Sequence, residues 1–261
     1  MSRLPLLACI ALCLAAGPTL AQSGAPAEKD WNVAVGAAGI FGSEFPGSDN
    51  EDFMAVPFID VEYKDRFFFN VPDGLGVNLI DEENDTGVGY RFGVAIAPEF
   101  EDRERSDAPN LPEVDMTALA TAFGNLSVGS FTFGARVAHD VLGNGHDGSW
   151  AQFDLDWSSR IGRSGFFSIG PFVRFADDDY MRSFYTVAPG VSAGTGLPAF
   201  EAEGGLERIG ARAIGVWRLT RQWELFGQIG VARLYGDAED SPISVDDRSV
   251  SAIVAVAYRF R

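Results

Sequence analysis

The residues best suited to acid–base chemistry gather in one short stretch of the chain. His139 and His146 are its two histidines, and Asp140 and Ser149 lie beside them. Hydrolytic barrels use a serine and a histidine oriented by a third polar group, and His139, Asp140 and Ser149 are the nearest approach to that set. A histidine next to an aspartate in a connecting segment is ordinary, and geometry rather than residue presence defines a catalytic site. We therefore expect a protein that is not an enzyme, with no catalytic residues and no cofactor.

Acidic residues cluster in segments between the predicted strands. Because hard cations take several oxygen ligands, these clusters could bridge divalent ions to lipopolysaccharide. No cluster has the fixed ligand spacing of a known cation loop, so solvated charge is the favoured interpretation and no metal site is predicted. The clusters are Asp49, Glu51 and Asp52; Asp81, Glu82, Glu83 and Asp85; the outer-loop candidates Asp177, Asp178 and Asp179; and Asp237, Glu239 and Asp240.

A third set of charged residues lies within the strands, on the face opposite the apolar one. A channel would use them as a selectivity lining, whereas a closed barrel would pair opposite charges across its interior and plug it. Both interpretations stay open. The predicted inward residues are Arg91, Arg136, Arg174, Arg212, Asp60, Asp115, Asp154 and Glu224.

The first 21 residues predict an exported protein. Arg3 precedes an apolar run over residues 4–16, and Thr19 and Ala21 are the small residues of a cleavage site before Gln22. A lipoprotein signal ending at Cys9 or Cys13 is the less favoured alternative. Either way both cysteines lie in the leader, so the mature chain offers no disulfide or thiolate.

The mature chain is strongly acidic. Removing the leader with its one arginine leaves 261 − 21 = 240 residues and a formal charge of 19 − 37 = −18. Such a field repels phosphate, which excludes a non-specific nucleic-acid binder. A hydrophobic content of 46% with 21 phenylalanines excludes a disordered chain.

The mature sequence alternates apolar and small or polar residues with a period of two. Residues 247–260, for example, place Val250, Val254 and Tyr258 on one face and Ser251, Ala255 and Arg259 on the other. The apolar face is continuous and aromatic, while the second face mixes Gly, Ala, Ser and sparse charges. This pairing of faces is typical of a transmembrane β-barrel, whose outer side contacts lipid.

We expect an all-β fold: an antiparallel barrel of about 12 strands with both termini periplasmic. The connections alternate between short and long, as in outer-membrane barrels. The uncharged segment 116–135 is predicted to be a hairpin turning at 124–126 and not a membrane-spanning helix. Pro57 and Pro171 fall within strands and predict bulges or register faults. The expected strands are 31–41, 53–63, 66–71, 75–80, 87–98, 113–123, 127–138, 149–161, 165–176, 206–219, 223–235 and 247–260.

Four segments resemble the MipA/OmpV family of Gram-negative outer-membrane proteins, and the resemblance extends over essentially the whole mature chain. They are 45–49 (FPGSD), 176–181 (ADDDYM), 196–200 (GLPAF) with 204–206 (GGL), and 233–243 (RLYGDAEDSPI), the last being the most specific. The resemblance implies a cell outer-membrane location, contact with lipid and lipopolysaccharide, and a scaffolding role between a murein transglycosylase and a murein synthase. It implies no catalytic residues.

The sequence therefore predicts a cleaved signal peptide over 1–21, a short periplasmic stub over 22–30 and a barrel over 31–261. The first functional hypothesis is a scaffold for murein machinery. The alternatives are a small porin-like channel for polar solutes and a surface adhesin or receptor acting through the long loop 177–205.

Overall fold

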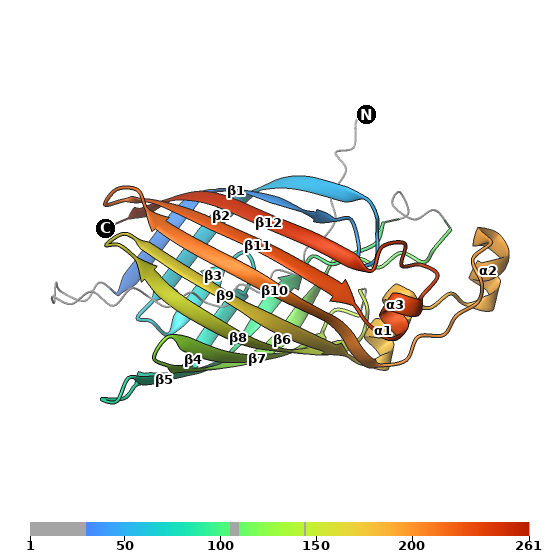
Figure 1. Cartoon of the computed structure of the whole chain (residues 1–261), viewed down its shortest axis with the longest axis horizontal. Helices are drawn as coiled ribbons and strands as arrows, with labels where there is room; N and C mark the ends of the chain where they lie inside the picture. The colour runs from blue at the N-terminus through green and yellow to red at the C-terminus, as the bar shows by residue number, and fades with distance from the viewer. Residues whose placement is uncertain (1–29, 105–109, 144, 261) are drawn as a thin grey trace.

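Twelve antiparallel strands close into a barrel in which each strand pairs with its sequence neighbour and β1 pairs with β12. The computed structural model describes residues 30–104, 110–143 and 145–260. The strands are β1 (Trp31–Ser43), β2 (Glu51–Tyr63), β3 (Phe67–Asn70), β4 (Gly74–Glu83), β5 (Val88–Glu99), β6 (Thr117–Val128), β7 (Phe131–Asp140), β8 (Ser149–Ile161), β9 (Gly165–Ala176), β10 (Gly205–Arg218), β11 (Trp223–Leu234) and β12 (Arg248–Phe260). The predicted antiparallel barrel of about 12 strands is confirmed (Figure 1).

Three short helices lie at one end of the barrel. They are α1 (Asp178–Tyr185) and α2 (Pro189–Thr195), between β9 and β10, and α3 (Asp237–Asp240), between β11 and β12. Figure 1 shows α1 and α3 against the strand ends, while α2 projects away from the barrel. Within the described ranges, no helix has the length and apolar character needed to cross a bilayer.

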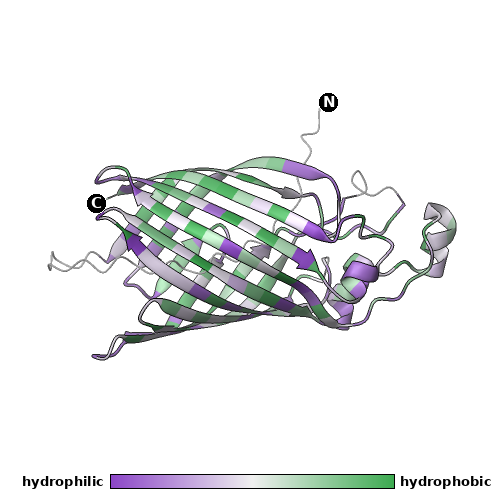
Figure 2. Cartoon of the chain, in the orientation of Figure 1, coloured by the Kyte–Doolittle hydropathy of each residue, from purple (hydrophilic) through white to green (hydrophobic). Residues whose placement is uncertain are grey.

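The period-two pattern places apolar side chains on the outside of the wall. In β5, Phe92, Val94 and Ile96 are exposed, whereas Ala95 and Ala97 point inward and are buried. Figure 2 shows the resulting hydrophobic surface along the strands, with hydrophilic residues gathered near both ends of the barrel. An outer face of this kind suits contact with lipid, and closure pairs the backbone groups that an open sheet would leave exposed at its edges.

The connections divide the barrel into two ends. Short turns join β2–β3, β4–β5, β6–β7, β8–β9 and β10–β11 at one end, and we call this the short-turn end. Asp30 and Phe260 lie there too, because the first residues of β1 pair with the last residues of β12. The longer connections lie at the opposite, long-loop end, whereas the tight β3–β4 link lies partway along the wall, because β3 ends at the level of Asp60 in β2.

The β6–β7 turn differs from the prediction. The reversal occurs at Gly129 and Ser130, whereas Gly124 and Asn125 remain inside β6 and pair with Ala135 and Gly134. The turn needs a positive φ, which Gly129 supplies at 60°. Gly124 is an ordinary strand residue, because a Cβ atom there would lie 3.7 Å from its nearest neighbours.

The proline prediction was wrong in its mechanism. The β1–β2 register runs unbroken past Pro57, and the β9–β10 register runs unbroken past Pro171. The register shifts fall instead at Leu79 in β4 and at Glu207 in β10. Pro57 needs no bulge, because β2 has no neighbouring strand on the side to which the N–H of residue 57 would point.

Most strand bounds also differ from the prediction, and two of the shifts concern charged residues. β4 continues to Glu83, because Asp81 points inward to pair with Arg91. β6 begins at Thr117 and not at 113, so Asp115 precedes the strand and is not part of its inward face. The predicted signal peptide, almost all of the stub and Arg261 lie outside the described residues.

Candidate functional site

The inward-facing charges form opposed pairs at several levels of the barrel. Arg91 lies 2.8 Å from Asp81, Arg136 lies 2.6 Å from Asp73, and Arg212 lies 2.9 Å from Asp154 and 3.0 Å from Asp156. Glu224 lies 2.8 Å from Arg259 and 3.7 Å from Arg218. Arg174 joins a larger network at the long-loop end.

Helix α1 lies across the long-loop end of the barrel, and we call it the cap. It begins directly after β9, where the Asp177 carboxylate accepts hydrogen bonds from the N–H groups of Tyr180 and Ser149. The first bond caps the helix and the second ties it to β8. Asp178 and Asp179 point to solvent and pair with Arg182. Of the three outer-loop candidates, Asp177 therefore caps the helix, Asp178 also accepts a hydrogen bond from the Gly204 N–H at 2.6 Å, and Asp179 is a surface charge.

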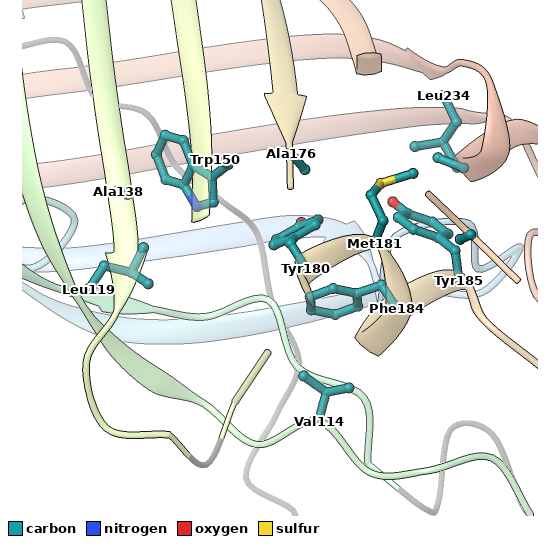
Figure 3. Packing of buried hydrophobic residues seen from close by; sticks show 12 residues of the cluster. Val114, Leu119, Ala138, Trp150, Ala176, Tyr180, Met181, Phe184, Tyr185 and Leu234 are labelled. Carbon is teal, nitrogen blue, oxygen red and sulfur yellow. The ribbon is translucent and has the colours of Figure 1, made fainter. Parts of the chain in front are cut away.

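The inner face of the cap packs onto the ends of the strands. Tyr180, Met181, Phe184 and Tyr185 have at most 1% of their surface exposed. Figure 3 shows Tyr180 and Phe184 on the side of Trp150 and Leu119, and Met181 and Tyr185 on the side of Leu234. The cluster also contains Val114, Ala138, Ala176, Ala202, Leu234 and Ala238. This burial indicates that the helix is held against the strand ends and is not a loose loop.

Glu101 connects the cap to the wall. This residue belongs to the β5–β6 connection, and its carboxylate lies 2.8 Å from Arg208 and 3.3 Å from Arg174. The Tyr180 hydroxyl donates to the same carboxylate at 2.5 Å. Burial alone would raise the pKa of Glu101, but the two guanidinium groups outweigh it and lower that pKa.

Glu207 provides the second carboxylate of this network and is fully buried. It accepts hydrogen bonds from Tyr185 at 3.0 Å and from Arg208, and Arg174 lies 3.9 Å away. Because of the bulge at Glu207, the adjacent side chains of Glu207 and Arg208 both point into the barrel interior. We call Glu101, Arg174, Glu207 and Arg208 the mouth network.

Arg103 locks the β5–β6 connection under the cap. Its guanidinium donates to the carbonyl oxygens of Phe184 at 2.7 Å, Ser183 at 2.9 Å and Pro112 at 3.0 Å. It therefore bonds the free carbonyl groups at the C-terminal end of α1, where a cation is favourable. Its side chain is 1% exposed, so the closure is sealed from water at this point.

A cavity of about 90 Å³ remains beside the mouth network. Ser249, Ser251 and Gln228 line one side, and Arg208 and Phe172 the other. The Gln228 Oε1 and Arg208 Nε atoms are buried and have no hydrogen-bond partner among the described residues. A cavity of this size and polarity has room for a few water molecules or one small polar solute.

The residues that could do nucleophilic chemistry do not assemble into a triad. The His139 imidazole lies 2.9 Å from the Ser149 hydroxyl on the outer surface. Asp140 points the other way, where it accepts from the Thr117 hydroxyl at 2.5 Å and from three backbone N–H groups. His139 therefore lacks the orienting contact from Asp140. No group of three or more His, Asp or Glu residues suited to a metal ion occurs in the described part of the chain.

Sequence reasoning missed the mouth network apart from Arg174. Residues 99–104 are dense in charge and lie in a connection between two predicted strands, so Glu101 and Arg103 carried no signal of burial. One signal was available. Glu207 and Arg208 are adjacent charges inside an otherwise alternating strand, a pattern that indicates a bulge.

Acidification is expected to loosen the cap. Burial lowers the pKa of His146, whose ring packs against Tyr180 and Phe184, with Asp140, Asp177, Glu101 and Arg174 as its charged neighbours. The opened state therefore binds a proton near the ordinary pKa of 6.5 before the closed state does, and closure weakens as pH falls below that value. Glu101 has a lowered pKa, so its contribution is lost as pH falls below the ordinary value of 4.5.

Hydrogen exchange of α1 amides across pH 7 to 4, corrected for intrinsic exchange, measures this effect. We expect two successive losses of protection, and H146Q should remove the first alone. H139A is the matched control, because that ring lies on the outer surface. Protection that stays constant over the whole range would contradict the assignment of both groups.

Comparisons with known proteins identify one family. A family model described as MltA-interacting protein MipA matches residues 35–260. No curated protein matches the chain in sequence. Among solved structures, OprB of Pseudomonas putida aligns at 11% identity with a TM-score of 0.39, covering 79% of this chain and 59% of that one.

Two further barrels align similarly. OprD of Pseudomonas aeruginosa gives 11% identity and a TM-score of 0.36, covering 82% of this chain and 56% of that one. An outer-membrane channel of Pseudomonas putida F1 gives 10% identity and a TM-score of 0.42, covering 91% of this chain and 100% of that one. The chain thus spans less than two thirds of the length of OprB and OprD. At these values the likeness carries nothing about solutes or partners.

Proposed function

The chain belongs to the family of the MltA-interacting protein MipA, and from this premise we propose that it is a non-enzymatic outer-membrane scaffold for murein machinery. Its partners would be a murein transglycosylase, as the family name implies, and a murein synthase. The observation that carries the proposal is the closed mouth. A barrel sealed by a packed helix and buried ion pairs is better suited to presenting surfaces than to passing solutes.

The short-turn end offers a docking surface with separated charges. Arg160, Arg163 and Arg221 are exposed on the β8–β9 and β10–β11 turns, which adjoin because β9 pairs with β10. Glu83 and Asp85 are exposed on the β4–β5 turn. Under the proposed orientation this end faces the periplasm. A surface with a basic and an acidic side favours partners of complementary charge and fixes how they dock.

Charge reversal at the basic turns tests this surface. R160E/R163E/R221E is expected to reduce binding of the purified transglycosylase about tenfold or more at low salt, because steering between charged surfaces is lost. Biosensor titration with the refolded barrel in nanodiscs measures the change. R182E, a reversal at the opposite end, should bind like the wild type. Equal affinities for all three proteins would refute docking at the short-turn end.

A small channel for polar solutes is the second candidate. The cavity of about 90 Å³ and its polar lining, which includes Ser249, Ser251 and Gln228, favour it. In this alternative the inward candidates Arg91, Arg136, Arg174, Arg212, Asp154 and Glu224 would form a selectivity lining once the cap opened. R136E would then change the ratio of anion to cation permeability.

A further inference from the structure

The wall of the barrel is incomplete beside β2. β3 pairs with β2 only from Asp60 to Tyr63, yet β2 continues for nine more residues to Glu51. Over the same nine residues β2 remains fully paired with β1 on its other side. At a rise of about 3.3 Å per residue, roughly 30 Å of strand edge extends beyond the last partner. Across the opening, β5 likewise runs past its last β4 pair at Ile96 and ends at Glu99.

The hydrogen-bond pattern shows which backbone groups face this opening. Lys64 N–H donates to Asp30 O, and Glu44 N–H donates to Asn50 O, so even-numbered β2 residues bond to β1. The odd-numbered residues Phe53, Ala55, Pro57 and Ile59 therefore turn their backbone groups toward the opening. Among the described residues none of these groups has a backbone partner.

Prolines stand on both sides of the opening. Pro57 lies on the free edge of β2, and its ring removes one of the N–H groups that would face a new strand. On β5, Asn84 N–H donates to Val88 O, so even-numbered residues face β4 and Pro98 faces the space beyond it. Proline on an exposed edge opposes strand addition. A second copy of the chain, or an extended peptide, is therefore poorly suited to this edge.

The surroundings of the opening are apolar on both faces of the wall. Outside, Phe53 and Ile96 are 63% and 52% exposed and would contact lipid. Inside, Val56 and Phe58 pack with Ala38, Ile253 and Ala255, although barrel interiors are usually polar. Across the opening, a small cavity of about 20 Å³ has a mixed lining: apolar residues including Pro72, Pro98 and Leu119, and the charged side chains of Glu99, Arg136 and Arg174.

The margin of the opening on the side of the short-turn end is polar. The β3–β4 link places Asp73 against Arg136 at 2.6 Å, and the Asn70 side chain accepts a hydrogen bond from Asp73 N–H. Hydrocarbon alone cannot satisfy the free edge, because unpaired backbone groups in a bilayer cost several kcal/mol each. A suitable occupant must supply hydrogen-bonding groups as well as an apolar chain.

We propose that the opening between β2 and β5 is a lateral binding site for a membrane amphiphile. Its polar head bonds to the free N–H and C=O groups of the β2 edge, and its acyl chain lies between Val56 and Phe58 inside the wall and the bilayer outside. The surrounding bilayer supplies this occupant directly, since both margins open within the apolar outer face. The site is independent of the proposed docking at the short-turn end.

Cysteine labelling tests the site without background, because the mature chain has no cysteine. V56C carries a bimane fluorophore on the inner side of the opening, and S168C carries it on the inward face of β9, several strands away. A55C, on the outer face, is the positive control for lipid contact. Each folded barrel is placed in vesicles containing phospholipid brominated on its acyl chains, and quenching is compared with that by aqueous iodide.

The proposal predicts acyl-bromine quenching of V56C at least half as strong as that of A55C, with none for S168C. F58C is the second inner position, should V56C fail to fold. Quenching of V56C by iodide alone would show a water-filled break and overturn the proposal. A disulfide-linked dimer of A55C formed across two β2 edges would overturn it as well, because a second copy would then fill the opening.

Discussion

E101A is expected to release the cap from the barrel mouth. The substitution removes the carboxylate shared by Arg174, Arg208 and the Tyr180 hydroxyl, and it leaves two guanidinium groups buried with fewer partners. Breaking a buried ion pair in this way costs about 3–5 kcal/mol. Hydrogen exchange in α1 should therefore accelerate roughly 10²–10⁴-fold, as opening becomes local and no longer requires the barrel to unfold.

R182A is the matched control for this prediction. Arg182 lies on the same helix, but its pairs with Asp178 and Asp179 are about half exposed and contribute little. Hydrogen exchange of the α1 amides in R182A should stay within a few-fold of the wild-type rate. E101Q, which keeps some hydrogen bonds but loses the charge, should fall between the two. Unchanged exchange in E101A would show that apolar packing holds the cap without the mouth network.

The second large effect concerns the seam where the first and last strands meet. A Cβ atom at Gly36 would lie 1.9 Å from the Val256 carbonyl oxygen and 2.8 Å from the Ala257 Cα atom. Both are backbone atoms, so neither can rotate away as a side chain would. G36A must therefore separate β1 from β12. Overpacking typically lowers the free energy of unfolding by about 1–3 kcal/mol, and we expect G36A to lower it by at least the upper end of that range.

The heat-dependent gel shift of the refolded protein measures this loss. G36A should give little or none of the fast-migrating folded band under conditions in which the wild type folds fully. G227A is the control, because a Cβ atom there meets nothing closer than 4.0 Å. A normal folded yield for G36A would mean that the β1–β12 seam is looser than its register indicates.

Much of the fold could be predicted because a barrel wall repeats one local rule. Lipid on one side and a packed interior on the other impose period two on every strand, and the twelve predicted strands all exist with shifted ends. The β6–β7 turn was misplaced because glycine occurs both in turns and within strands. Gly129 supplies the positive φ of the turn, whereas Gly124 lies inside β6, where a Cβ atom would make only an ordinary contact of 3.7 Å with the Phe92 ring.

The mouth could not be predicted, because its contacts join segments far apart in sequence. Arg103 bonds to Phe184, and Glu101 pairs with Arg208, across 81 and 107 positions. No local periodicity marks such contacts, and charged residues in a long connection resemble solvated ones. The free β2 edge was hidden for a similar reason. Pro57 signalled an irregularity, but only the shortness of β3 shows that it is an unpaired edge.

Conductance of the purified, refolded wild-type barrel in planar bilayers tests the central claim most directly. The gel shift first establishes that the protein is folded, and E101A in the same bilayer shows that an opened mouth can be detected. The account predicts a silent wild type, because α1 and the mouth network seal the long-loop end. Discrete, reproducible current steps from the folded wild type would contradict it and favour the channel for polar solutes.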